Sequence, residues 1–133
     1  MNESNAKKII LAVDDMPMNL ATIQVILHDG FDIRLSKSAK VALTMLNTIK
    51  ADLILLDIEM PEMSGFEFLE RLQNNPELKQ IPVVFITSHE SPEFTIKAAA
   101  SGAKDYVIKP IVPGILLKKI NAILEAPVLP ALL

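Results

Sequence analysis

The sequence contains no cysteine, and this absence excludes whole classes of protein. Without cysteine there is neither a disulfide scaffold nor a thiolate metal site, and such a composition suits a reducing cytosol. Long apolar runs are missing too. The segment Ile9–Val13 ends at two aspartates and is too short for a secretion signal or a membrane span. We therefore expect a cytoplasmic protein that makes no contact with a membrane.

Clusters of basic residues are also missing. The 13 lysines and arginines are spread along 133 residues beside 16 acidic side chains, and the formal net charge is −3. A protein that binds a nucleic-acid backbone carries a basic patch, so direct contact with nucleic acid is not expected. The chain also has no glycine-rich loop of the Walker or dinucleotide type, which argues against a nucleotide-binding cradle.

The chain does contain a regular alternation of apolar patterns, at a length that fits one domain. Short β-rich runs occupy residues 9–13, 31–36, 53–56, 83–86 and 106–108. Segments of helical period follow them at residues 20–27, 41–46, 66–72, 94–100 and 115–124, the first after Pro17 and the second after a Ser38 cap. This alternation predicts an α/β fold with a parallel sheet covered on both faces. We expect the domain to span residues 8–125, with the proline-interrupted residues 126–133 as a linker stub or disordered tail.

Polar side chains follow four of the predicted strands, at the edge where open parallel sheets bind ligands. They are Asp14 and Asp15, Asp57 and Glu59, Thr87 with Ser88 and His89, and Lys109 before Pro110. Each has an ordinary structural explanation when taken alone. An aspartate caps a helix or forms a turn, a threonine caps a helix, and a lysine or histidine lies on the surface.

Together these residues indicate a phosphoryl site. Carboxylates brought within about 4 Å repel each other by ~4 kcal/mol per pair at an effective dielectric near 20, so they need a cation or raised pKa values. Oxygen ligands without histidine or cysteine favour Mg²⁺, Mn²⁺ or Ca²⁺, and room for water favours Mg²⁺, which normally accompanies phosphate. Lys109 supplies a mobile positive charge for phosphate oxygens, and Thr87 supplies a hydroxyl donor.

Four stretches of the sequence carry a family resemblance over about residues 8–124. They are Val13–Asp15, Leu53–Gly65, Pro82–Ser88 and Gly102–Pro110. With these stretches in this order, the chain resembles the receiver domains of two-component response regulators. The resemblance implies a flavodoxin-like, doubly wound sheet of five parallel strands in the order 2-1-3-4-5, flanked by five helices.

The same resemblance implies the chemistry of the site. Asp57 is expected to be the phosphoacceptor, and a sensor histidine kinase or histidine phosphotransfer protein is expected to be the donor. Mg²⁺ would be held by Asp15, Asp57 and the backbone carbonyl of Glu59, and through water by Asp14. Lys109 would offset charge on the phosphoryl oxygens, before a cis bond to Pro110. The domain would catalyse only its own phosphorylation and dephosphorylation.

The family's switch has a counterpart in Thr87 and Tyr106. Thr87 is expected to move toward the phosphoryl group and Tyr106 to turn inward, remodelling a face made by residues 94–100, 106–108 and 115–124. That face would control an output domain or a partner, with a homodimer on activation. We expect apolar side chains to face outward there, among Ile96, Ala99, Ala100, Ile111, Val112 and Ile115. Glu59 and His89 are expected to tune the lifetime of the phosphoryl group.

Some positions depart from the family pattern, namely Met16, Ala39, Ile111 and Ile115. The last two argue against the charged dimer interface of the large DNA-binding subfamilies, and Asp14–Leu20 looks more like receivers of hybrid kinases or cyclic-dinucleotide enzymes. Two other functions stay open. A haloacid-dehalogenase-like phosphatase with Asp57 as its nucleophile would need a second aspartate two residues on, where Glu59 stands. Such enzymes carry their nucleophile on the first strand, where this chain has the Asp14–Asp15 pair. A non-phosphorylated interaction module of the same fold would not need the site residues.

Overall fold

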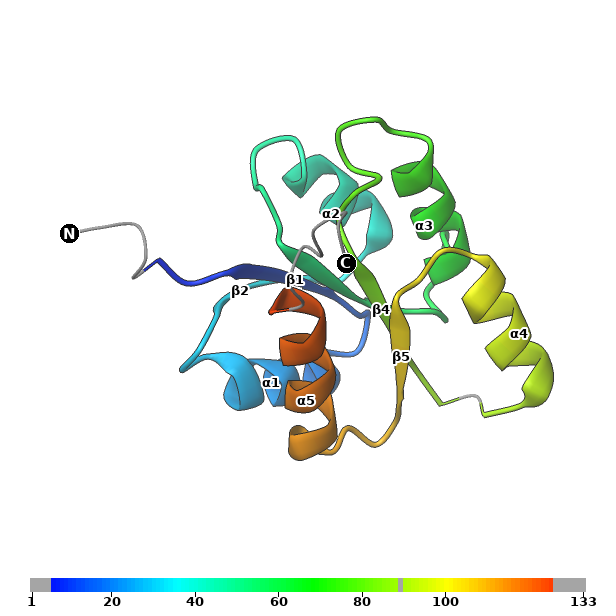
Figure 1. Ribbon diagram of the computed structural model, residues 1–133. Helices are drawn as coiled ribbons and strands as arrows, with labels where there is room; N and C mark the ends of the chain where they lie inside the picture. The colour runs from blue at the N-terminus through cyan, green and yellow to red at the C-terminus, as the bar shows by residue number, and fades with distance from the viewer. Residues whose placement is uncertain (1–5, 89, 126–133) are drawn as a thin grey trace, which may run out of the picture.

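Five parallel strands form a central sheet with helices on both of its faces (Figure 1). The computed structural model describes residues 6–88 and 90–125, so His89 and the predicted tail at residues 126–133 lie outside the described residues. The strand order is β2-β1-β3-β4-β5, which confirms the predicted doubly wound topology. None of the described helices is long and apolar enough to cross a membrane.

Strands and helices alternate strictly along the chain. In order they are β1 (Ile9–Val13), α1 (Pro17–Leu27), β2 (Asp32–Ser36), α2 (Ala39–Met45), β3 (Leu53–Asp57), α3 (Gly65–Gln73), β4 (Val83–Thr87), α4 (Pro92–Ala100), β5 (Asp105–Ile108) and α5 (Pro113–Leu124). Every neighbouring pair of strands is parallel. A parallel strand needs a crossover to return to the same edge, and each helix supplies one.

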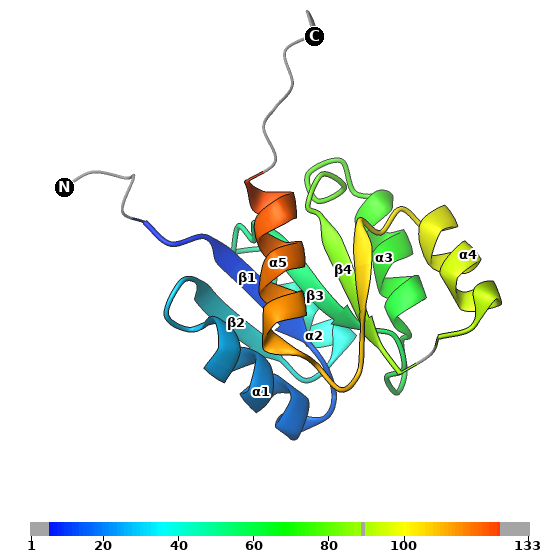
Figure 2. The ribbon, with the colours of Figure 1, turned by 60° about the horizontal axis from the view of Figure 1, so that its bottom comes forward.

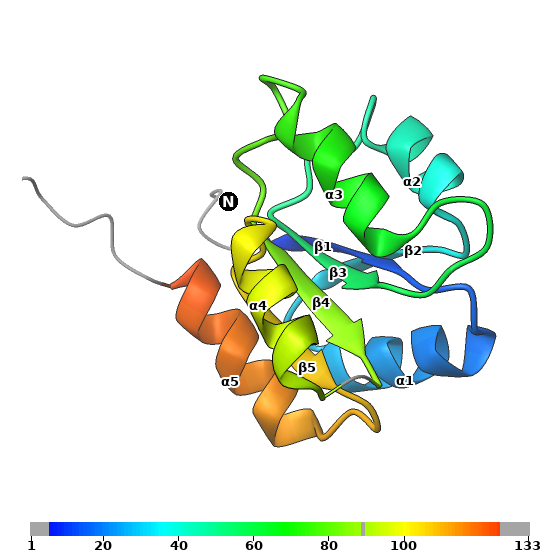
Figure 3. The ribbon, with the colours of Figure 1, turned by 90° about the vertical axis from the view of Figure 1, so that its right-hand side faces the viewer.

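The sheet separates two hydrophobic cores, because successive side chains of a strand point to opposite faces. In β3, Leu53 and Leu55 pack with α1 and α5, whereas Ile54 and Leu56 pack with α2, α3 and α4. Figure 2 shows α1 and α5 together on one face, and Figure 3 shows α2 and α3 on the other. All five residues of β3 and of β4 are buried, which explains why both strands read as continuous apolar runs.

The predicted elements are all present, and the differences lie at their ends. The helices α4 and α5 begin two residues before the predicted starts, at Pro92 and Pro113. Proline is favoured at the first helical position because the helix needs no N–H there, but apolar periodicity does not register it. The residues Asp57 and Thr87 are the last members of β3 and β4 rather than loop residues, because both still pair with neighbouring strands.

Gly65 holds the loop after β3 close to the end of that strand. It is the first residue of α3, which starts with a capping box between Ser64 and Glu67. Its backbone N–H donates to the carbonyl of Ile58 at 2.8 Å. A Cβ atom at position 65 would lie 2.6 Å from the carbonyl oxygen of Asp57 and 2.8 Å from the Cα of Ile58. Only glycine therefore allows this close approach of the loop to Asp57.

We predict that Gly65→Ala destabilises the domain by about 2 kcal/mol, because the new methyl group meets backbone atoms that cannot turn aside. Gly114→Ala is the matched control, since that glycine is also in the first turn of a helix and a Cβ there meets nothing within 4 Å. The control should be neutral or slightly stabilising. Urea unfolding of the three proteins measures both effects. Equal stability of Gly65→Ala and the wild type would contradict the predicted clash.

Candidate functional site

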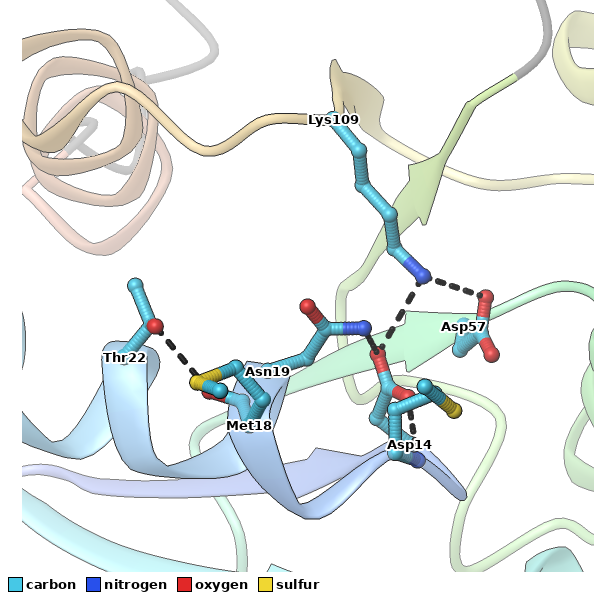
Figure 4. Close-up of polar contacts among 7 residues, drawn as sticks. Asp14, Met18, Asn19, Thr22, Asp57 and Lys109 are labelled. Atoms are coloured by element: carbon cyan, nitrogen blue, oxygen red, sulfur yellow. Dashed lines mark hydrogen bonds and ion pairs between the residues drawn. The ribbon is translucent and has the colours of Figure 1, made fainter.

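The carboxyl ends of the parallel strands bring the predicted site residues to one edge of the sheet. Because β1 and β3 pair Val13 with Leu56, the next residues along, Asp14 and Asp57, stand beside each other. The side chain of Lys109 comes from the end of β5 and passes over the end of β4 to reach both aspartates (Figure 4). Residues that are up to 95 positions apart in the sequence, Asp14 and Lys109, are therefore in direct contact.

Three carboxylates form the centre of this site. One oxygen from each of Asp14, Asp15 and Asp57 lies within 4.8 Å of the others. Asp14 is 1% exposed and Asp57 4% exposed, while Asp15 is half-buried. With Lys109 nearby, two negative charges remain uncompensated among these four side chains. A cluster of hard oxygen atoms with that charge fits a small divalent cation such as Mg²⁺.

Lys109 lies between two of the carboxylates. Its Nζ atom is 3.3 Å from Oδ1 of Asp57 and 3.4 Å from Oδ2 of Asp14. Its backbone N–H donates to the carbonyl of Thr87 at 2.7 Å, which ties the residue to the end of β4. The following bond to Pro110 is cis, as the family resemblance implied. The ammonium group is thus held in the site while its side chain keeps 22% exposure.

The pKa of Asp57 is raised from 3.8 to about 6. Burial is the largest cause, because removing the carboxylate from water disfavours its charged form, and the negative charge of Asp14 acts in the same direction. Attraction to Lys109, its hydrogen bond and a hydrogen bond from the backbone of Glu59 oppose the shift. At neutral pH Asp57 is therefore mostly ionised and can act as a nucleophile, at an energetic cost to the fold.

The predicted switch residues occupy neighbouring strands. Thr87 is 2% exposed at the end of β4, beside the carboxylates. Tyr106 in β5 is half-buried, and its ring packs edge-on against Phe94 of α4 at 5.7 Å between centroids. The hydroxyl of Tyr106 lies 3.5 Å from Oγ1 of Thr95, and Lys119 approaches the ring from α5. Tyr106 thus contacts both helices of the predicted signalling face.

Sequence reasoning assigned no role to Asn19, which the structure places in the site. Its side-chain amide donates to Oδ2 of Asp14 at 3.1 Å, the oxygen that Lys109 also approaches (Figure 4). The signal in the sequence was its position in the first turn of the helix that follows the aspartate pair. That signal is weak, because an asparagine in a first turn is common and its direction depends on the helix start. His89, expected near the site, lies outside the described residues.

Related sequences cover most of this chain. The response regulator receiver domain family matches residues 10–121. A protein of Vibrio cholerae named "Probable cyclic di-GMP phosphodiesterase" is 40% identical over 116 residues, which are 87% of this chain and 26% of that protein. A two-component response regulator of rice, Oryza sativa subsp. japonica, is 34% identical over 117 residues, 86% of this chain and 89% of that protein. The chain thus spans about a quarter of the phosphodiesterase's length and nearly all of the rice regulator's.

Solved structures show the same fold. The chemotaxis protein CheY4 of Vibrio cholerae superposes with a TM-score of 0.82 at 31% identity, covering 87% of this chain and 98% of that one. A signal receiver domain of a histidine kinase from Syntrophus aciditrophicus gives 0.82 at 28% identity, covering 90% and 91%. Together with the family match, these likenesses show that this chain belongs to the response regulator receiver family and is a receiver domain of two-component signal transduction.

Proposed function

We propose that this receiver domain accepts a phosphoryl group on Asp57 in a Mg²⁺-dependent reaction. The observation that carries the proposal is that the buried Asp57 carboxylate lies beside the Lys109 ammonium group and close to two further carboxylates. An exposed aspartate in a turn would have an ordinary pKa, whereas burial raises the pKa of this one to about 6. The donor is a sensor histidine kinase or a histidine phosphotransfer protein, and the family membership supports this class of donor.

The metal ligands in this proposal are Asp15, Asp57 and the backbone carbonyl of Glu59, with Asp14 acting through water. When bound, Mg²⁺ offsets the charge of the phosphoryl oxygens and of the carboxylates themselves. The three aspartates already lie within 4.8 Å of one another, and Glu59 is only two residues from Asp57 in the loop that Gly65 draws inward. The donor set contains oxygen alone, as Mg²⁺ prefers.

In the transfer step one carboxylate oxygen of Asp57 attacks the phosphorus atom of a phosphohistidine. A P–O bond forms as the P–N bond breaks, and the imidazole leaves with the electron pair. Lys109 is placed to leave Asp14 and donate to a phosphoryl oxygen, because its ammonium is already 3.3 Å from the attacking carboxylate. Thr87, at the end of the adjacent strand, donates its hydroxyl to another oxygen. Hydrolysis of the acyl phosphate by the domain itself completes the cycle, and we propose no other enzymatic activity.

The signalling face in this proposal consists of α4, β5 and α5. Its exposed apolar side chains are Ile96, at 70% exposure, Val112, at 48%, and Ile115, at 49%. The small side chains of Ala99 and Ala100 are also exposed on α4, while Ile111 instead packs on the core under α5. We propose that this face docks an output domain or a partner protein and forms a homodimer on activation. Its contact would be mostly apolar, and so only weakly dependent on salt.

The remaining proposals concern the setting of the domain. We propose that residues 8–125 form the functional unit, which the family match over residues 10–121 supports. We also propose that it works in the cytoplasm, where histidine kinases present their phosphorylated histidine. Neither nucleic acid nor membrane is proposed as a direct partner, because the acidic chain carries no basic cluster.

We predict that Asp57 is the single phosphorylation site. Incubation with phosphoramidate and Mg²⁺ should add one phosphoryl group by intact mass, and Asp57→Asn or chelation with EDTA should abolish it. Asp52→Asn is the matched control, because Asp52 is also a partly buried aspartate, and it bonds the backbone of Ile9 away from the site. The control should be labelled like the wild type. Labelling of Asp57→Asn at the wild-type rate would contradict the assignment.

We predict that Asp57→Asn stabilises the metal-free domain at neutral pH. Because the fold raises the pKa of Asp57 from 3.8 to about 6, stability from this group is present below pH 3.8 and lost as the pH rises through 6. Asparagine avoids that loss, so the unfolding free energy of Asp57→Asn should exceed that of the wild type by on the order of 2 kcal/mol at pH 8. The difference should disappear toward pH 4. Urea unfolding in EDTA measures it.

Adding Mg²⁺ at pH 8 should reduce the difference in unfolding free energy between Asp57→Asn and the wild type. The cation stabilises the wild-type site, and it binds more weakly where asparagine replaces the Asp57 carboxylate. Asp29→Asn serves as the control, because the Asp29 carboxylate is 95% exposed and is not one of the three clustered carboxylates, so Mg²⁺ should not change its effect on stability. A metal-free Asp57→Asn protein that is less stable than the wild type at pH 8 would contradict the destabilisation of the Asp57 carboxylate by burial and by the charge of Asp14.

We predict that activation with beryllofluoride increases self-association through the α4-β5-α5 face, and that Ile115→Glu blocks it without altering phosphorylation. Sedimentation velocity measures the association. Tyr106 is the only tyrosine in a chain without tryptophan, so intrinsic fluorescence independently reports whether the face has responded. Val25→Glu on α1, where the valine is 73% exposed, is the control and should associate like the wild type. Activated protein that stays monomeric at high concentration would contradict self-association, and the face would then serve a different partner or none.

A further inference from the structure

Both carboxylate oxygens of Asp14 have defined hydrogen-bond donors. Oδ1 accepts from the backbone N–H of Met16 at 2.9 Å, and Oδ2 accepts from the side-chain amide of Asn19 at 3.1 Å. The Nζ atom of Lys109 lies 3.4 Å from the same Oδ2 (Figure 4). One buried oxygen is therefore shared between a neutral amide from α1 and the ammonium group that also contacts Asp57.

Lys109 donates a hydrogen bond to Asp57 and also forms an ion pair with Asp14. Its distances of 3.3 Å to Asp57 and 3.4 Å to Asp14 are nearly equal, and both are longer than the roughly 2.8 Å of a strong charge-assisted hydrogen bond. The position of the ammonium is thus a balance between two carboxylates. Any change in how strongly Oδ2 of Asp14 needs a donor shifts that balance.

The hydrogen bond from Asn19 reduces the need of Asp14 Oδ2 for a donor from Lys109. A buried carboxylate oxygen without a donor is costly, so Oδ2 must be hydrogen-bonded in the fold. With the Asn19 amide removed, Lys109 becomes the remaining donor among the side chains seen at this oxygen. The ammonium would then move toward Asp14 and away from Asp57, where the phosphoryl group arrives.

The start of α1 keeps the Asn19 amide in place. The backbone N–H of Asn19 donates to the carbonyl of Met16 at 3.0 Å, and the N–H of Met16 donates to Asp14. Met16 is the N-cap of α1 and makes no capping hydrogen bond with its side chain, so Asp14 ties the helix start to the site. Asp14, Met16 and Asn19 are thus joined to one another by hydrogen bonds in a closed ring. An amide suits this place because it donates a hydrogen bond without changing the charge of the site.

Building on the proposed phosphorylation of Asp57, we propose that Asn19 is a positioning residue for phosphoryl transfer. Its amide occupies Oδ2 of Asp14, so that Lys109 stays shared between Asp14 and Asp57 and is free to meet the incoming phosphoryl oxygen. Asn19 itself touches neither the phosphoryl group nor Asp57. It acts through the position of Lys109.

The test measures phosphorylation by phosphoramidate over a range of Mg²⁺ concentrations, together with Mg²⁺ binding by calorimetry. In Asn19→Leu and Asn19→Ala the maximum rate at saturating Mg²⁺ should fall about tenfold, as is usual when a supporting hydrogen bond is lost. The Mg²⁺ dissociation constant should change much less, because Asp14, Asp15 and Asp57 all remain. Thr22→Val is the matched control, since it removes a hydrogen bond to the carbonyl of Met18 within the same helix. It should leave both quantities unchanged.

The Lys109→Met background separates positioning from a general loss of structure. If Asn19 acts through Lys109, adding Asn19→Leu to Lys109→Met should lower the rate no further. An equal fractional loss in both backgrounds would overturn the proposal, and so would a wild-type maximum rate in Asn19→Leu or a loss confined to Mg²⁺ affinity. If the wild-type protein took no phosphoryl group, the proposed function would fail, and this inference with it.

Discussion

The parallel pairing of β1 with β3 is the constraint on which the site depends. Their register sets Val13 against Leu56, and therefore Asp14 beside Asp57 at the edge of the sheet. A slip of one residue would turn every side chain of a strand to the opposite face. It would exchange the contributions of β3 to the two hydrophobic cores, as well as moving Asp57 away from Asp14. The apolar packing that stabilises the sheet thus also holds two mutually repelling carboxylates together.

The energetic conflict at the sheet edge explains the other features of the site. Burial and the charge of Asp14 raise the pKa of Asp57 to about 6, so the site favours a proton or a bound cation at this carboxylate. Lys109 relieves part of this repulsion from the end of β5, because its ammonium group contacts both Asp57 and Asp14. Gly65 and Asn19 act from the adjoining helices, one admitting the β3–α3 loop close to Asp57 and the other holding Asp14.

The strand order connects the site to the face made by α4, β5 and α5. Thr87 and Tyr106 lie on the neighbouring strands β4 and β5, and Tyr106 contacts Phe94 on α4 and Lys119 on α5. A change at the end of β4 is therefore one strand away from a face where Ile96, Val112 and Ile115 are exposed. That short path gives a physical basis for the proposed coupling of phosphorylation to docking.

The sequence by itself determined the element order, the parallel α/β class and the residues at the strand ends, because short apolar runs and helical periods are local signals. It also determined that Asp14, Asp57 and Lys109 belong to one edge, since parallel strands end together. The helix starts at Pro92 and Pro113 are local signals as well, because proline favours the first helical position, although apolar periodicity does not register them. Tertiary structure alone decided the close approach of Gly65 to the end of β3. It also decided the sharing of one Asp14 oxygen by Asn19 and Lys109. These depend on distances between segments far apart in the chain, which no local pattern encodes.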